Sequence, residues 1–155
     1  MTDDKNTEFG ALDHIGWRLW QAAQVWKIRF TEGMLAEGYG WYAEARSSVV
    51  PYIGPDGIRQ SELVRRMGLT KQAVQQLVDD LVKAGIVERI PDPDDRRGKI
   101  VRFTSAGIAA QRDADKIKVR IETEMRETLG AEDFDRLYAL LRRLIDADES
   151  NPGPR

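Results

Sequence analysis

The chain has 155 residues, of which 41% are hydrophobic and 32% charged, and its formal net charge is −2. This composition is unlike that of a disordered or membrane-embedded chain, and the length suits one domain that buries roughly two thirds of its unfolded surface. The absence of cysteine excludes disulfides and thiolate metal sites, and the single histidine excludes a site built from several histidines. Because the N-terminus is acidic and polar, unlike a signal peptide, we expect a cytoplasmic protein.

The N-terminal third has the pattern of helices. Apolar residues at steps of three and four predict a long helix over residues 11–36, which two glycines then interrupt. A second helix is expected over 41–53, before the turn GPDG at 54–57. His14 lies in the first helix, where we expect it on a polar or interface face, with ligand contact or pH sensing as the alternative.

The segment 58–90 has the pattern of two short helices joined by a tight turn and followed by a strand. Gly68 ends the first helix, for which Ser61 or the residue before it is a suitable N-cap, and Thr70 is a natural N-cap for the second. The inner face of the second helix is predicted to consist of Val74, Leu77, Val78 and Leu81. Such a pair is a helix-turn-helix. The runs IVERI and KIVRF then form a hairpin that adds a wing.

The C-terminal third is predicted to form two further helices. Thr104 caps a long helix that ends at Gly130, with Ile108 and Met125 among its apolar residues. In the last helix, Phe134, Leu137, Leu141 and Leu144 recur at the spacing of a helix that packs on another helix. The first helix and these two have more apolar surface than one small module can cover, so we expect a homodimer.

The expected fold class is therefore mainly α with a small β wing, an α+β arrangement. We expect one domain in four parts: N-terminal helices for dimerisation and a possible effector pocket (11–53), a winged helix-turn-helix lobe (57–104), C-terminal dimerisation helices (105–148) and a tail (149–155).

Positive charge is concentrated in the middle of the chain. Residues 58–102 contain ten lysines and arginines against seven acids, a balance of +3, so the total of −2 leaves −5 for the rest. A basic middle with acidic flanks permits a polyanionic partner despite the net charge.

The start of the second helix of the pair carries side chains that suit DNA. Lys71 can meet a phosphate, and Gln72, Gln75 and Gln76 carry amides of the kind that read adenine in the major groove. The amide dipoles at a helix start also favour anions. An ordinary solvated helix is the alternative, because Gln and Lys are good helix formers on any surface.

The stretch DPDDRRGK at 92–99 holds more charge than a hairpin turn requires. Pro91, just before this stretch, and Pro93 stiffen the base of the tip, and Asp94 and Asp95 can hydrogen-bond the turn backbone or hold an arginine. Three basic side chains then remain available, namely Arg96, Arg97 and Lys99. A projecting basic hairpin suits the minor groove, which attracts arginine, although a charged solvated turn is the alternative.

Residues 59–107 resemble the winged-helix regulators of the MarR family, through LVKAG, the wing DDRRGK and the FTSAG that opens the next helix. The resemblance implies a homodimer that binds double-stranded DNA at a pseudo-palindromic site, usually as a repressor, and is released by a small molecule. Carried over by position, 70–76 lie on the recognition helix and Arg97 is the wing arginine. Asp95 would brace the wing, and Ser61 would contact a backbone phosphate.

The same resemblance implies an effector pocket between the N-terminal helices and the lobe. The candidate lining residues are Trp17, Arg18, Trp20, Tyr39 and Arg46. Aromatic rings with an arginine at their edge can hold an aromatic acid. The alternative is that these rings belong to the core and the dimer interface.

An enzyme and a protein-interaction module are the two competing classes of function. No nucleophile elbow, P-loop or zincin motif is present, so we expect no catalytic residues, no metal and no cofactor. A winged-helix protein-interaction or dimerisation module without sequence-specific DNA binding is the remaining alternative. The residues leave repression and activation both open.

Overall fold

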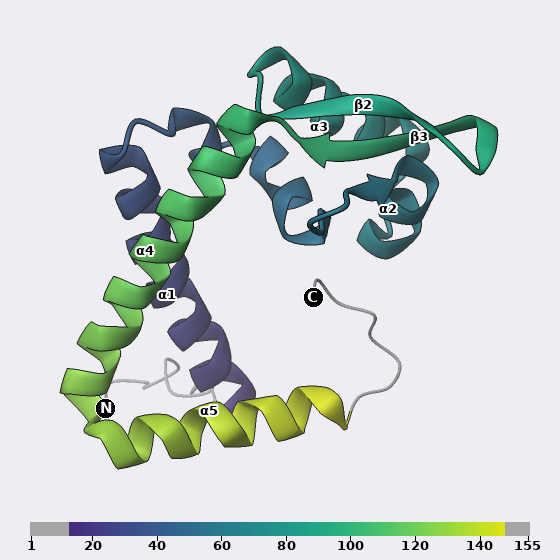
Figure 1. Cartoon of the computed structure of the whole chain (residues 1–155). Coiled ribbons are helices and arrows are strands. Elements are labelled where there is room, and N and C mark those ends of the chain that lie inside the picture. Colours follow the sequence, from purple (N-terminus) through teal and green to yellow (C-terminus); the bar gives the residue numbers. More distant parts are fainter. Residues whose placement is uncertain (1–12, 148–155) are drawn as a thin grey trace, which may run out of the picture.

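Five α-helices, two short 3-10 helices and a three-stranded sheet form residues 13–147, the part of the chain that the computed structural model describes (Figure 1). In chain order these are α1 (Ile15–Ala36), η1 (Gly40–Ala43), η2 (Ala45–Tyr52), β1 (Ile58–Arg59), α2 (Gln60–Met67), α3 (Lys71–Lys83), β2 (Val87–Asp92), β3 (Asp95–Phe103), α4 (Ser105–Leu129) and α5 (Ala131–Asp146). The predicted mainly helical fold with a small β wing is confirmed. The predicted helix start at 11–12 and the tail lie outside the described residues. None of these helices is both long and apolar enough to cross a membrane.

Helix α1 begins later than predicted. His14 has an extended backbone and caps the helix, because its Nδ1 accepts a hydrogen bond from the backbone N–H of Trp17 at 3.3 Å. The histidine expected on a polar or interface face therefore has a local structural role, as the residue that sets where the helix starts.

Helices α1 and α4 lie side by side (Figure 1), and the buried residues of α1 all lie in its C-terminal part. Phe30 and Met34 pack with Ile117 of α4 in a small core. A Cβ on Gly33 would lie only 2.7 Å from Cγ2 of Ile117, so the helices approach closely at this glycine. At the other end of the predicted stripe, Ile15 is 74% exposed.

The predicted α-helix over 41–53 is wrong in type. This segment forms the two 3-10 helices η1 and η2, separated at Glu44, whose backbone is extended. Pro51 lies inside η2 and has no N–H to donate, which disfavours a regular α-helix there. The segment still contributes buried apolar side chains to the lobe, among them Trp41 and Val49.

The helix-turn-helix is confirmed. Gly68 ends α2 in the left-handed conformation with φ of 62°, and the Thr70 hydroxyl accepts from the N–H of Ala73 at 3.2 Å to start α3. Three residues of the predicted inner face are fully buried, namely Val74, Val78 and Leu81, whereas Leu77 is half-buried against them. The N-cap of α2 is Arg59, not Ser61, which lies within the first turn.

The sheet contains one strand more than the predicted hairpin. Its order is β1-β3-β2, with β1 antiparallel to β3 through Ile58 opposite Val101 and Arg59 opposite Ile100. Two residues are too few to show the alternation that identifies a strand in a sequence.

The wing strands also extend further than predicted. Strand β2 continues to Asp92 and β3 begins at Asp95, so only residues 93–94 form the turn. Asp92 is paired with Asp95, but Pro91 is paired with Lys99. Residues 96–98 therefore bulge from the ladder, which directs a side chain away from the regular strand path.

At the C-terminus, the Thr104 hydroxyl accepts from the N–H of Gly107 at 3.1 Å and so caps α4 as predicted. Ile108, expected along the apolar face, is 45% exposed instead. Helix α5 turns at Gly130 and crosses below the α1–α4 pair (Figure 1). Of its predicted seam, Phe134 is buried, Leu137 and Leu144 are exposed, and Leu141 is half-buried.

Candidate nucleic-acid interface

Ion pairs cancel most of the charge in residues 58–102. Six of the ten cations are paired with acids of the same segment: Arg59 with Asp92 and Asp94, Arg65 and Arg66 with Glu62, Lys83 with Asp80, Arg89 with Asp79, and Arg102 with Glu88. Four have no acidic partner within the described part of the chain: Lys71, Arg96, Arg97 and Lys99. These four are the cations that the sequence singled out for DNA. The unbalanced positive charge of the lobe is thus confined to the start of α3 and the wing.

The glutamine side chains on the exposed side of α3 are largely available for contacts outside the chain. Gln72 and Gln75 are exposed on the first turns of the helix, and Gln76 is exposed but donates to Oδ1 of Asp80 at 3.0 Å. Arg89 of β2 lies behind this helix, donating to Asp79 at 2.6 Å and to Gln60 of α2 at 2.8 Å. Arg89 therefore ties α3 and α2 to the wing, a role that its place in the sequence did not predict.

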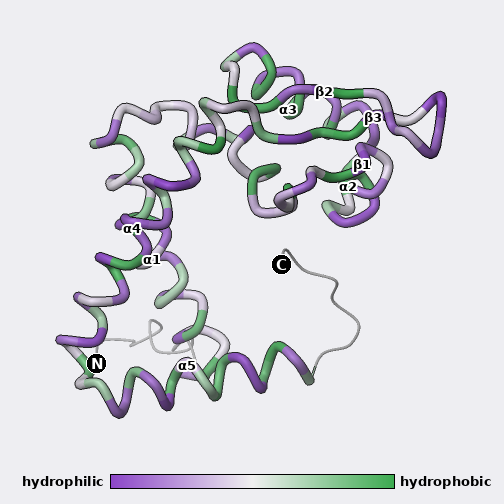
Figure 2. Tube along the Cα trace, in the orientation of Figure 1, coloured by the Kyte–Doolittle hydropathy of each residue, from purple (hydrophilic) through white to green (hydrophobic). Residues whose placement is uncertain are grey.

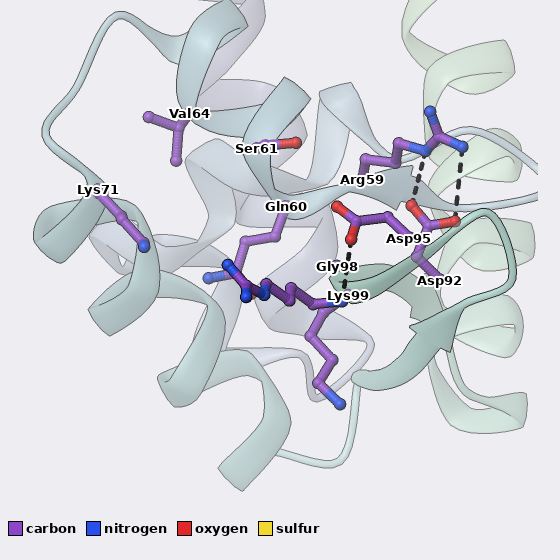
Figure 3. Close-up of a pocket in the computed structure, with 10 residues that line it drawn as sticks. Arg59, Gln60, Ser61, Val64, Lys71, Asp92, Asp95, Gly98 and Lys99 are labelled. Carbon is purple, nitrogen blue, oxygen red and sulfur yellow. Dashed lines mark hydrogen bonds and ion pairs between the residues drawn. The ribbon is translucent and has the colours of Figure 1, made fainter.

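A groove of about 440 Å³ joins the starts of α2 and α3 to the wing (Figure 3). Its lining residues are Arg59, Gln60, Ser61, Val64, Lys71, Asp92, Asp95, Arg97, Gly98 and Lys99. Five residues predicted from the sequence are thus brought together from three elements, namely Ser61, Lys71, Asp95, Arg97 and Lys99. Five others do not line it and are exposed beside it: Thr70, which caps α3, Gln72, Gln75 and Gln76 on that helix, and Arg96 in the bulge of the wing.

Two kinds of contact hold the wing tip. As predicted for a bracing residue, Oδ1 of Asp95 accepts from the backbone N–H of Arg97 at 2.9 Å. Arg59 of β1 bridges two further wing carboxylates, 2.7 Å from Asp92 and 2.7 Å from Asp94. This role of Arg59 was not predicted from the sequence. The only available signal was the excess of aspartates in DPDD, which implied that an arginine was held but not that it came from 33 residues away.

At the start of α2, two arginines share one carboxylate. Hydrogen bonds from Arg65 and then Arg66, at 2.6–2.8 Å, lower the pKa of Glu62 to about 2. Glu62 is thereby ionised at neutral pH, and neither arginine lines the groove.

The residues proposed for an effector pocket do not form one site. Trp17 and Trp20 stack on each other, with ring centroids 4.9 Å apart, on the exposed N-terminal part of α1, where Arg18 pairs with Asp13. Tyr39 follows the other end of this 22-residue helix, which is about 33 Å long. The prediction of one pocket from the five is therefore wrong, because a helix of this length separates its two ends.

The other two residues of that set have local partners. The Tyr39 hydroxyl donates to Asp113 of α4 at 2.7 Å, and this hydrogen bond raises the pKa of Tyr39. Arg46 pairs with Glu44 and donates to the backbone oxygen of Asp80. Both residues hold the N-terminal segment to its neighbours.

A different groove lies between α1 and the η1–η2 segment. It has a volume of about 670 Å³, and the rings of Trp26, Phe30 and Tyr42 line it together with Lys27 and Glu44. Phe30 meets Tyr42 edge to face, with centroids 5.1 Å apart. Burial raises the pKa of the Tyr42 hydroxyl.

Comparisons with known proteins agree with this geometry. The model of the MarR family matches residues 52–98, which span the helix-turn-helix and most of the wing. The multiple antibiotic resistance protein MarR of Escherichia coli (strain K12) is 29% identical over 85 residues, 54% of this chain and 59% of that protein. The HTH-type transcriptional repressor NicR of Pseudomonas putida is 30% identical over 91 residues, 59% of this chain and 58% of that protein. The matched part of the chain thus spans less than two thirds of these curated relatives.

The likeness in three dimensions extends further along the chain. A crystal structure of a mutant MarR from E. coli complexed with operator DNA aligns with a TM-score of 0.63 at 23% identity, over 83% of this chain and 91% of that one. The flanking helices therefore share the arrangement of that protein, although their sequences have diverged. The chain therefore shares the fold of that MarR structure, and its sequence is similar to the MarR family through residues 52–98.

Proposed function

We propose that this protein binds double-stranded DNA as a homodimer and regulates transcription, as a repressor that a small organic effector releases. The observation that carries the proposal is the distribution of charge in the lobe. Six cations are neutralised by ion pairs, and the four that are not lie at the start of α3 and on the wing. A surface that binds phosphates must keep its cations unpaired, whereas a merely soluble surface has no such need.

The geometry supports different DNA contacts for α3 and for the wing. Lys71 and the first amide groups of α3 favour a phosphate, while Gln72 and Gln75 are exposed for base edges of the major groove. The wing bulge carries Arg96 and Arg97 beyond the body of the lobe, where a minor groove would meet them. In the related MarR crystal structure the protein is complexed with operator DNA.

Unpartnered apolar surface supports a homodimer. Helix α5 exposes Leu140, Leu144 and Ile145 by 50%, 59% and 70%, and the N-terminal part of α1 exposes Trp17 and Trp20. Along α5, hydrophobic positions recur between hydrophilic ones (Figure 2). Burying them in a second copy would place two α3 helices in successive major grooves about 34–36 Å apart.

Repression and effector release are supported by different observations. The relative NicR is named as a transcriptional repressor. The groove between α1 and η1–η2 offers Trp26, Phe30 and Tyr42 to an aromatic ligand, with Lys27 at its edge for a carboxylate. A ligand there would change the angle between α1 and the lobe and so the spacing of the two recognition helices.

The test is selection of DNA from a library of source-genome fragments, with Arg97→Ala and Arg102→Ala proteins run in parallel. Arg102 is the matched control because it is a wing-strand arginine that is paired with Glu88. We expect a two-fold symmetric motif that is enriched by the wild-type and Arg102→Ala proteins and only weakly by Arg97→Ala. No enrichment by a folded wild-type dimer would refute the proposal and favour an interaction module.

A further inference from the structure

We infer that Arg59 is a positioning residue, which holds the wing in the shape that binds DNA without contacting DNA itself. The inference rests on the proposed DNA-binding function. It concerns a residue that lies in the groove and would otherwise be counted among the phosphate-binding cations.

Two of the three guanidinium nitrogens of Arg59, Nε and Nη2, contact carboxylates of the wing. Its Nε lies 2.7 Å from Oδ2 of Asp92, its Nη2 lies 3.5 Å from Oδ1 of the same carboxylate, and that Nη2 lies 2.7 Å from Oδ2 of Asp94 (Figure 3 shows the Asp92 contacts). A planar guanidinium can bridge two carboxylates in this way because its donors are fixed in a fork.

The carboxylate of Asp92, which Arg59 contacts, is buried. Asp92 is 5% exposed and is the one charged side chain among the buried residues of the described chain. Its Oδ1 also accepts from the backbone N–H of Asp94 at 3.0 Å, which ties the carboxylate to the turn. A buried carboxylate is tolerated when it is paired and hydrogen-bonded, so Arg59 and the turn depend on each other.

The buried carboxylate in turn shapes the bulge that carries the wing arginines. A Cβ on Gly98 would lie 3.0 Å from Cβ and 3.2 Å from Oδ2 of Asp92, so the bulge rests directly on this side chain. Asp95, paired with Asp92 across the turn, holds the backbone N–H of Arg97. The path from Arg59 to Arg97 is therefore a continuous series of contacts through the tip.

Local charge argues against a direct phosphate contact by Arg59. Two carboxylates surround one guanidinium, so the cluster has a net charge of −1. A phosphate would be repelled by this cluster, whereas Lys71, Arg97 and Lys99 around the same groove have no acidic partner in the described structure.

The two roles for Arg59 predict different behaviour for a lysine at this position. Arg59→Lys keeps the charge, so a phosphate contact would survive. Lysine lacks the fork and cannot span Asp92 and Asp94 in the same geometry, so the bracing would be lost. Arg102→Lys is the matched control, because Arg102 is also in the sheet, is 48% exposed against 51% for Arg59, and has a single acidic partner, Glu88.

The first measurement uses the free protein. Hydrogen exchange of the backbone amides of Asp94 and Arg97 is compared between the wild type, Arg59→Lys and Arg102→Lys, with amides of α3 as an internal reference for global stability. We expect Arg59→Lys to increase exchange at the wing but not in α3, and Arg102→Lys to leave both unchanged. Unchanged wing exchange in Arg59→Lys would overturn the inference.

The second measurement is affinity for a labelled duplex that carries the motif enriched by the wild-type protein. We expect Arg59→Lys to bind about tenfold more weakly, comparable to loss of a single arginine contact. In an Arg97→Ala background the same change should have little further effect, because both act through one wing. Wild-type affinity for Arg59→Lys would show that Arg59 has no effect on DNA binding. Losses that multiply in the double variant would show that Arg59 acts independently of Arg97. Either result would overturn the inference. If even the wild type binds no duplex, the proposed function fails, and the exchange data still decide whether Arg59 braces the wing.

Discussion

The salt dependence of DNA binding is the most direct check on the charge distribution. For duplex DNA the slope of log K against log salt is about −0.9 for each phosphate contact. Four unpaired cations per protomer give at most eight contacts in a dimer, and hence a slope no steeper than about −7. Lys71→Ala removes two of these contacts, so its slope should be shallower by about 1.8, and its binding curve should approach that of the wild type as salt rises.

Lys83→Ala provides the control. Lys83 lies at the opposite end of the same helix, its side chain is 74% exposed, and its Nζ is 3.8 Å from Asp80. The assay is fluorescence anisotropy of a labelled duplex over a series of potassium chloride concentrations. We expect no change of slope for Lys83→Ala. If Lys71→Ala and Lys83→Ala made the salt slope shallower by the same amount, the reasoning would be refuted. The attraction for DNA would then come from the whole charged surface and not from the unpaired cations.

Three further predictions concern stability and assembly. Gly107→Ala should destabilise the protein by about 3 kcal/mol in thermal unfolding, because its Cβ would lie 2.1 Å from the carbonyl oxygen of Ile86, whereas Gly40→Ala, with no neighbour within 4 Å, should not. Leu144→Glu should convert the proposed homodimer to a folded monomer in light scattering, since the side chain is 59% exposed in one chain; a persistent dimer would place the interface elsewhere. Because the pKa of Glu62 falls from 4.5 to about 2 on folding, its ion pairs stabilise the protein above pH 4.5, and this contribution is lost as the pH falls towards 2. In Glu62→Gln, the free energy of unfolding should therefore fall less steeply between pH 4.5 and pH 2 than in the wild type. An unchanged fall would count against this role of Glu62.

Local signals were enough to predict the lobe. Gly68 and Thr70 mark the turn between α2 and α3 through the left-handed conformation and a side-chain cap, both of which depend on a few neighbouring residues. The apolar spacing of α3 likewise identified its buried face. The predicted α-helix over 41–53 failed for a local reason, because Glu44 is extended and Pro51 has no N–H to donate. Strand β1 was missed because a distant part of the chain decides it, since its two residues form a strand only by pairing with β3.

The sequence by itself determined the residue types of the interface: the wing cluster, the amides of α3 and their resemblance to the MarR family. Only the tertiary structure decided which cations are free. Arg59 meets Asp92 and Asp94, and Arg89 meets Asp79, because β1, β2 and α3 are packed together. A charge count cannot reveal this, since the strength of an ion pair depends on the distance between its atoms and not on their order along the chain.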